Sequence, residues 1–337
     1  MGWVAAAGML LLGAAPAGAE QRVLEVPATA SWQHAATGFI APPKVAGFTR
    51  TKIADSTNEE LDVAIAYASP DNSAHADVYL FKPGLYDLPV WFDRAMTAIR
   101  SRPEYGIAGE PAATAVAFSR PGAAAKSGLR AVMPIHYGDY KSSAVALLPM
   151  DGWLVTVRMS STAADPAEVD ARLTAFVAGL RWPAEKKPAA EAVPVVDCLK
   201  PLAFKKAKRL PQDMTSALIA ATGAMIRDKP EAPPPVYCRD PSSTDQYGVY
   251  RPNGSKDGYV VARGDAGIAL GVFPEIDISG FLGTEGSGGK SRVSVTLLNR
   301  GTVGEIASFN RLPPPEQAVN APPSKGTHIT VSSSKEN

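Results

Sequence analysis

The chain has 337 residues, of which 45% are hydrophobic and 20% are charged, as is ordinary for a globular protein. Its 34 lysines and arginines nearly cancel 33 acidic residues, so the formal net charge of +1 provides no global field that would attract nucleic acid. This length favours two domains over one, and the 30 prolines gather in stretches that are typical of linkers and tails.

The first residues carry the pattern of an export signal. The apolar run from Val4 to Ala15 is shorter than the ~20 residues of a membrane span, and Ala17-Gly18-Ala19 supplies the small residues that signal peptidase needs. We therefore expect residues 1–19 to be a signal peptide, and the mature protein to be periplasmic or secreted without a transmembrane helix. No lysine or arginine precedes the apolar run, which leaves open a true start upstream of Met1.

The region 22–182 alternates strand and helix patterns. Alternation of apolar and polar residues predicts strands at 62–68, 76–81, 114–118, 129–135, 143–148 and 153–159. Apolar residues at helical spacing predict a helix over 88–101 and a second one from Pro166 to about Leu180, with Asp165 as its N-cap and Glu168 at its third position. An antiparallel sheet packed by two helices buries all these apolar faces.

This order of elements resembles the PsbP-like αβα sandwich. The segments that carry the resemblance are KVAGFTR at 44–50, the paired strands DVAIAYA and ADVYLF, the helix after them, SSAVALLPMDGWLVTVRMS, and the closing helix that ends in LRWP. The resemblance covers about 140 residues of the N-terminal region, and many exported bacterial proteins of unassigned role share its plan. It implies a non-catalytic module that docks on another macromolecule.

The rest of the chain is predicted to be a linker, a smaller domain and a tail. Residues 183–194 are proline, alanine, glutamate and lysine with almost no bulky apolar residue, which is typical of a linker. Residues 195–312 are predicted to form a small, mostly-β domain with one helix over 212–227. Its predicted strands are 236–239, 247–251, 258–263, 268–273, 292–299 and 302–309. The proline-rich tail, 313–337, is predicted to be disordered apart from a short strand at 327–331, and the fold class is α+β.

The two cysteines, Cys198 and Cys238, are predicted to form a structural disulfide. An even number of cysteines in an exported chain favours pairing. Closing a loop of about 40 residues contributes roughly 4 kcal/mol in the chain-entropy model. No CxxC motif exists and no histidine lies near either cysteine, so metal ligation is poorly supported.

Three short motifs suggest functions, but each has a simpler interpretation. In GTEGSGGKS, residues 283–291, threonine stands at 284, where a phosphate-binding loop needs its first glycine, and the residues that follow favour a strand over a helix. We therefore expect a loop without a nucleotide. Arg263-Gly264-Asp265 and Asn253-Gly254-Ser255 are expected to form tight turns rather than an adhesion ligand and a glycosylation site.

The histidines indicate neither a metal nor another cofactor. His34, His75, His136 and His328 show no ligand spacing, and HExxH is absent. His136 and Asp139, in HYGDY between two predicted strands, are the residues best suited to an acid–base pair. Since no GxSxG motif accompanies them and glycine and aspartate are normal loop residues, catalysis there is the weaker interpretation.

One run of cations stands out. It contains Lys200, Lys205, Lys206, Lys208 and Arg209, in a stretch with no acidic residue. Contact with an anionic surface is one hypothesis, with roughly 1 kcal/mol from each charge. The alternative, a solvated face with Phe204 packed inward, is simpler, and we favour it.

These observations favour a non-enzymatic binding or adaptor protein of the cell envelope, whose partner is an envelope protein or ligand. An envelope hydrolase with an inter-domain site at His136 and Asp139 is the first alternative. The second is a peripheral protein held to an anionic surface by the basic run, residues 200–209.

Overall fold

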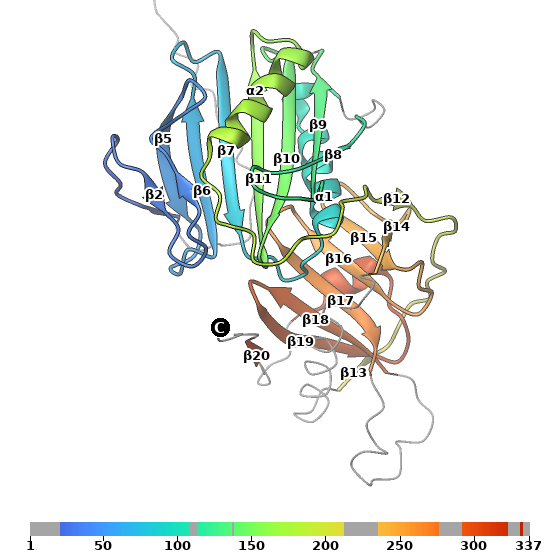
Figure 1. Cartoon of the computed structure of the whole chain (residues 1–337). Helices are drawn as coiled ribbons and strands as arrows, with labels where there is room; N and C mark the ends of the chain where they lie inside the picture. Colours follow the sequence, from blue (N-terminus) through green and yellow to red (C-terminus); the bar gives the residue numbers. More distant parts are fainter. Residues whose placement is uncertain are drawn as a thin grey trace, which may run out of the picture.

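The computed structural model describes residues 21–107, 113–136, 138–211, 235–275, 292–322 and 331–332 (Figure 1). The expected signal peptide, the helix predicted over 212–227 and the GTEGSGGKS stretch lie outside the described residues. Among the described residues, no helix is long and apolar enough to cross a membrane.

The N-terminal sheet is antiparallel, with the order β1-β5-β6-β7-β11-β10-β9-β8 and with β4 paired to β5. Its strands are β1 (Arg22–Val23), β4 (Lys44–Val45), β5 (Phe48–Asp55), β6 (Asp62–Ala68), β7 (Ala74–Phe81), β8 (Val116–Phe118), β9 (Gly128–Pro134), β10 (Ser142–Met150) and β11 (Trp153–Ser161). All strands predicted here are present, with ends shifted by about two residues at most. The alternation that identifies a strand is broken in β5, because its pairing with β6 shifts register between Arg50 and Lys52.

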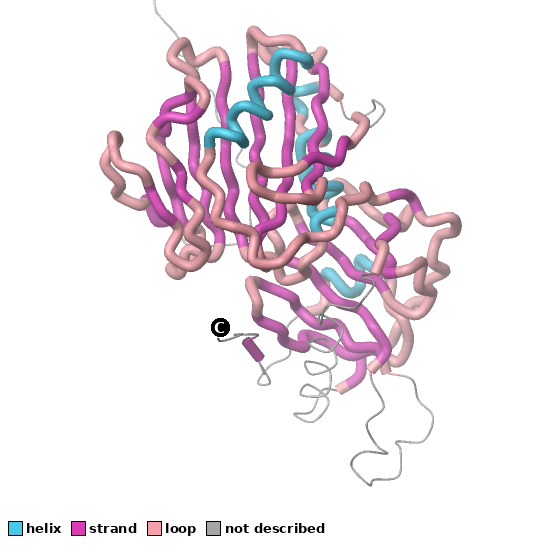
Figure 2. Tube along the Cα trace, viewed as in Figure 1, coloured by secondary structure: helices cyan, strands magenta, loops and turns pink. Residues whose placement is uncertain are grey.

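Two helices cover opposite faces of this sheet, α1 (Leu88–Arg100) and α2 (Pro166–Gly179) (Figure 2). Side chains alternate between faces along a strand, and every residue of β10 is buried. Val145 and Leu147 belong to the cluster that contains α1, whereas Ala144 and Ala146 belong to the cluster that contains α2. The fold is therefore α+β, with an antiparallel sheet packed by two helices, as predicted.

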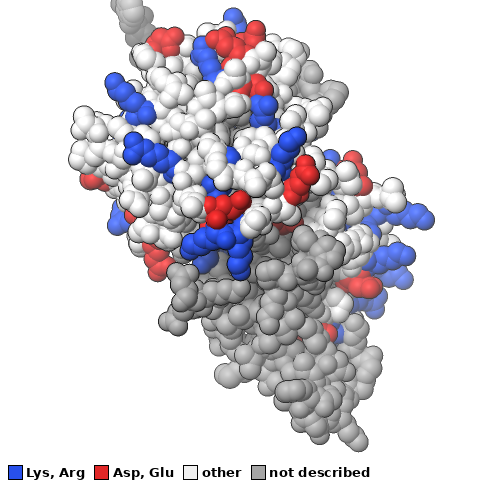
Figure 3. All heavy atoms as spheres, in the orientation of Figure 1, with Lys and Arg blue, Asp and Glu red and all other residues white. Residues whose placement is uncertain are grey.

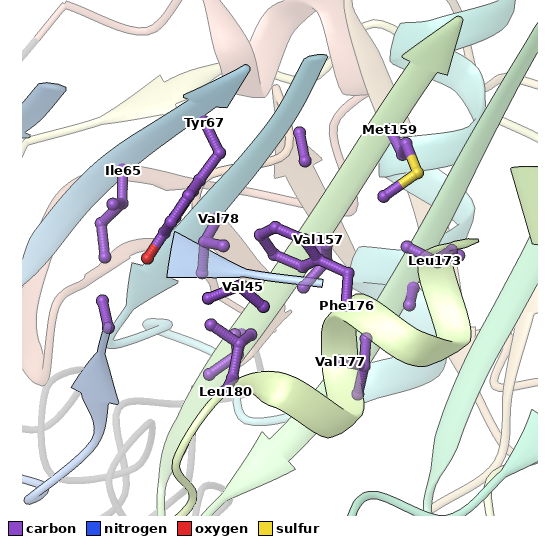
Figure 4. Packing of buried hydrophobic residues seen from close by; sticks show 14 of the residues in the cluster. Val45, Ile65, Tyr67, Val78, Val157, Met159, Leu173, Phe176, Val177 and Leu180 are labelled. Carbon is purple, nitrogen blue, oxygen red and sulfur yellow. The ribbon is translucent and has the colours of Figure 1, made fainter. Parts of the chain in front are cut away.

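Both helices begin where the sequence places a cap. The Asp165 carboxylate accepts a hydrogen bond from the Glu168 N–H at 2.9 Å, and that of Asp87 accepts one from the Val90 N–H at 3.0 Å. On α2, Phe176 makes edge contacts with the rings of Tyr67 and Phe48, at the centre of the packing drawn in Figure 4.

A second, mixed sheet follows, with the order β12-β14-β15-β16-β17-β18-β19-β13. Its strands are β12 (Val196–Asp197), β13 (Arg209–Leu210), β14 (Tyr237–Arg239), β15 (Tyr247–Pro252), β16 (Tyr259–Arg263), β17 (Ile268–Pro274), β18 (Val293–Asn299) and β19 (Thr302–Phe309), with β20 (Val331–Ser332) paired to β19. The parallel pair β12–β14 is joined by the predicted disulfide, Cys198–Cys238, whose Cα atoms lie 4.9 Å apart. The second and third strands of the chain, β2 (Trp32–Gln33) and β3 (Ile40–Ala41), form a separate small sheet.

Helix α1 is the layer that the two sheets share. Its Trp91 and Phe92 lie in one hydrophobic cluster with Val145 of the first sheet and with Tyr250 and Val260 of the second. Its 13 residues include none that is exposed, whereas α2 has an exposed outer side. A helix that is covered all round belongs to a core, so α1 is an internal helix of the whole chain.

The other face of the second sheet is covered by residues 199–208 and by α5 (Pro315–Val319). Gln317 accepts a hydrogen bond from the Ala207 N–H at 3.1 Å and donates one to the Ala207 carbonyl at 2.7 Å. The Tyr259 hydroxyl donates to the Pro313 carbonyl at 2.6 Å. The prediction of a disordered tail is therefore wrong for residues 313–322, because proline and alanine side chains, among them Pro315 and Ala318, pack on the sheet.

The predicted linker forms neither helix nor strand. It is attached to the first sheet all the same: Ala192 is buried, and its N–H donates to the Lys126 carbonyl at 2.9 Å.

A close backbone contact between the two sheets gives a testable prediction. The Gly84 N–H donates to the Gly267 carbonyl at 2.7 Å, and a Cβ at Gly84 would lie 2.2 Å from the Leu298 carbonyl group. Because backbone atoms would have to move, Gly84→Ala is expected to lower the free energy of unfolding in urea by about 2–3 kcal/mol.

The control is Gly122→Ala. There an added Cβ meets nothing within 4 Å, and only the φ of +79° opposes alanine, which costs about 1 kcal/mol. Equal losses in the two variants would contradict the close approach at Gly84.

Candidate functional site

The predicted pair His136 and Asp139 lies in the exposed loop between β9 and β10. In the part of the chain that the structure describes, no side-chain hydrogen bond or ion pair joins them. Strand register places this loop at the end of the sheet that carries Ser161 and Ala74. The backbone hydrogen bond that joins the two sheets, from Gly84 to Gly267, lies beyond Phe81 at the opposite end of β7. The geometry therefore gives no support to an inter-domain hydrolase site at these two residues.

His34 and His75 are the other histidines that the structure describes, since His328 lies outside the described residues. The ring nitrogens of His34 are hydrogen-bonded to Thr37 Oγ1 at 2.8 Å and to the Glu60 carbonyl at 3.0 Å, and burial lowers the pKa of this buried ring. His75 is exposed. Among the described residues, no group of three or more His, Cys, Asp or Glu side chains is placed to hold a metal ion.

The basic run lies on the second sheet. Phe204 and Tyr259 make an edge contact with ring centroids 5.7 Å apart, so the prediction that Phe204 packs inward is confirmed. Arg209 is half-buried and donates to the carbonyls of Ile306 and Pro322. The remaining four cations are exposed: Lys200, Lys205, Lys206 and Lys208.

The two motifs predicted to be turns are turns. Asn253 and Gly254 have φ of 49° and 66°, as a tight hairpin turn requires, and Gly264 has a φ of 57° between β16 and β17. Asp265 has a further role that the sequence did not indicate. Its carboxylate forms an ion pair with Arg158 of the first sheet.

Buried polar groups of α1 hold the two sheets together. Arg94, which is 2% exposed, donates to the carbonyls of Gly264, Thr244 and Asp245 at 3.0, 3.2 and 2.8 Å. All three carbonyls belong to loops of the second sheet. A buried guanidinium is stable only where such acceptors satisfy it, so these bonds determine how the second sheet sits on α1.

Asp93 makes a second set of contacts across the same junction. Its carboxylate pairs with Arg239 at 2.8 Å and accepts a hydrogen bond from the Tyr250 hydroxyl at 2.6 Å. Burial, followed by the Asp93 charge, raises the pKa of Tyr250 well above its usual value. Tyr250 therefore stays protonated and acts as a donor, which is a structural role.

A further polar group, the junction cluster, lies where α1 ends and the hairpin of Asp265 meets the first sheet. Its members are Asp77, Tyr79, Arg102, Tyr105, Arg158 and Ser160. Arg158 stands directly opposite Asp77 in the register of β7 and β11, and its guanidinium lies 5.4 Å from the centre of the Tyr79 ring. Arg102 donates to the Tyr105 hydroxyl at 3.2 Å, and this hydroxyl is 3.0 Å from Ser160 Oγ.

Desolvation dominates the electrostatics of the junction cluster. Burial raises the pKa of Asp77, and the charges of Arg158 and Arg102 oppose that rise. Burial also raises the pKa of Tyr79 and lowers that of Arg158. Charged groups held at the margin of a core in this way interact strongly with a ligand that supplies matching hydrogen bonds.

Beside the cluster, part of the first sheet is lined by small side chains that stay partly exposed in the structure. We call Ala64, Ala66 and Ala68 the open face; all three are half-buried, while Val63, Ile65 and Tyr67 on the opposite side of β6 are at most 1% exposed. Ala64 pairs with Tyr79 and Ala66 with Asp77, so the open face borders the cluster. The alternation in DVAIAYA indicates such a face, but its charged neighbours come from β7, β11 and the end of α1.

Comparison of the chain with protein-family models, with curated proteins and with solved structures finds no match. The resemblance to the PsbP-like sandwich therefore stays an expectation, and the candidate site rests on the geometry of this chain.

The role of Arg94 can be tested by removing its charge. Arg94→Met keeps most of the side-chain volume but removes the buried donor of three hydrogen bonds across the junction, so the free energy of unfolding is expected to fall by about 3 kcal/mol. Arg172→Met on α2 is the control, because that side chain is more than one-third exposed and pairs with Glu168, one turn away on the same helix. Arg172→Met should lower the free energy of unfolding by less than about 0.5 kcal/mol in the same urea titration. Similar decreases in the two variants would contradict the junction role of Arg94.

The cap of α1 gives a prediction on pH. Burial raises the pKa of Asp87 to about 6, and the hydrogen bond from the Val90 N–H opposes the rise. The pKa of this carboxyl in the unfolded chain is about 3.9. The stabilisation that comes from protonated Asp87 in the folded protein is therefore complete below about pH 4, and it is lost as the pH rises through about 6.

Asp87→Asn keeps the cap and removes the titration. Relative to the unaltered protein, this variant should lose less stability between about pH 4 and 6.5, by about 2–3 kcal/mol. Asp165→Asn, at the cap of α2, is the matched control in urea unfolding at each pH. An unchanged slope in Asp87→Asn would contradict the raised pKa.

Proposed function

We propose that the protein is a non-enzymatic binding or adaptor protein of the extracytoplasmic space, and that its partner occupies the open face and the junction cluster. The observation that carries the proposal is the half-buried charged cluster beside a sheet face lined by alanine. The Cys198–Cys238 disulfide supports the location, since such bonds persist in oxidising compartments.

The open face suits an approaching polypeptide. Alanine side chains allow close contact with a flat sheet surface, and their burial against a partner would remove apolar area from water. At the border, Arg158 and Arg102 provide donors, and Asp77 provides a carboxyl group. Charge-assisted hydrogen bonds from such groups give an interface its orientation and specificity. We therefore favour a segment of another protein as the occupant.

The hydrolase alternative has no geometric observation in its favour, because His136 and Asp139 are exposed and no side-chain hydrogen bond or ion pair joins them among the described residues. A single function is therefore proposed.

Filling the open face tests the proposal. A photoreactive side chain at Ala68 should crosslink a specific envelope protein, and Ala66→Arg should reduce that crosslink at least about ten-fold because a long charged side chain occupies the contact surface. Ala175→Arg, on the exposed side of α2, is the matched control and should leave the crosslink unchanged.

Thermal unfolding of both variants verifies that each remains folded. If folded Ala66→Arg gives the same crosslink as the control, the open face is not the binding surface and the proposal fails.

A further inference from the structure

A second surface combines exposed apolar side chains with cations. Of the seven large apolar side chains that are exposed among the described residues, four lie in or next to the edge of the second sheet. We call them the apolar edge: Val193, Val196, Leu199 and Val236, which are between 62% and 102% exposed. Large apolar side chains on a surface are ordinary when scattered, but a group at one edge indicates contact with another phase or molecule.

The backbone here is held firmly. Cys198 is linked to Cys238, and its N–H donates to the Arg239 carbonyl at 2.8 Å. Arg251 donates to the Lys200 carbonyl at 2.5 Å, and the Leu202 N–H donates to Asp240 at 3.0 Å. Leu199 stands between these anchors and is fully exposed. The fold itself therefore presents this leucine to the outside.

The cations continue from the same point. Residues 199–208, the basic strap, run from the β12 edge of the second sheet to β13 at the opposite edge. Phe204 and Ala207 pack against the sheet, while Lys200, Lys205, Lys206 and Lys208 are exposed. In Figure 3, blue side chains gather at the right-hand margin, near the edge labelled β12 and β14 in Figure 1.

Nearby carboxylates do little to neutralise the strap. The strap contains no acidic residue. Asp197 is paired with Arg239, and Asp240 is buried against Arg251. The exposed carboxylate of Glu316 is adjacent to Gln317, which bonds Ala207, and it offsets at most one of the four lysine charges. Lys200 therefore places a positive charge beside the apolar edge, and Lys205, Lys206 and Lys208 extend the positive field along the strap towards β13.

We propose that the apolar edge and the basic strap dock the protein on a lipid bilayer that carries anionic headgroups. Leu199 and the neighbouring valines would enter the interface between headgroups and acyl chains, and the lysines would contact the phosphates. Apolar anchors flanked by cations are the combination that binds anionic membrane surfaces, since neither part alone gives stable attachment. The open face belongs to the first sheet, so this proposal is independent of the partner proposed above.

Co-sedimentation with vesicles tests the inference. The protein should bind vesicles of phosphatidylcholine with about 30% phosphatidylglycerol at least about ten-fold more strongly than pure phosphatidylcholine vesicles. Raising sodium chloride from about 0.1 M to about 0.5 M should release most of it, because salt screens the lysines.

Two variants separate the two parts of the surface. Leu199→Glu should reduce binding about ten-fold, and so should the triple variant Lys205→Ala, Lys206→Ala and Lys208→Ala. The matched control replaces three exposed lysines of the first sheet and its loops by alanine, and it should change binding less than about two-fold. Its positions are Lys44, Lys52 and Lys141.

The proposal is overturned if the protein binds neither kind of vesicle, if it binds both equally, or if folded Leu199→Glu binds as the unaltered protein does. Thermal unfolding and non-reducing electrophoresis confirm the fold and the disulfide of each variant.

Discussion

The burial of α1 on all sides is the constraint on which the rest of the structure depends. One sheet would leave half of this helix in water, and its Trp91, Phe92 and Ile99 are all at most 3% exposed. The second sheet completes the burial with Tyr250, Val260 and Ala262. The hydrophobic driving force for forming the two sheets therefore acts through the same helix, so each sheet stabilises the other.

Polar groups turn this shared burial into a defined arrangement. Apolar contacts alone allow many orientations, whereas the three carbonyls bound by Arg94 and the two partners of Asp93 fit one orientation. That orientation brings Asp265 of the second sheet to Arg158 of the junction cluster. It also leaves the open face on the first sheet and the apolar edge on the second, so each is free to meet a different partner.

Local pattern was enough to predict every strand of five or more residues except β5, as well as the α2 cap and the disulfide, because these depend on neighbouring residues or on a single pair of cysteines. The burial of α1 against both sheets could not be predicted. Asp93 and Arg94 resemble the solvent-facing residues of an amphipathic helix, and the carbonyls bound by Arg94 lie at least 150 residues away in the chain. Asp77 and Arg158 likewise become neighbours only through strand register. The His136–Asp139 hypothesis relied on closeness in sequence and took no account of which end of the sheet meets the second domain.

Differential scanning calorimetry of the whole chain tests the shared core most directly. If α1 is internal to both sheets, the protein should unfold in one transition whose van't Hoff enthalpy equals the calorimetric enthalpy. Two separate transitions, each with its own midpoint, would show that the sheets fold independently, and would contradict the account.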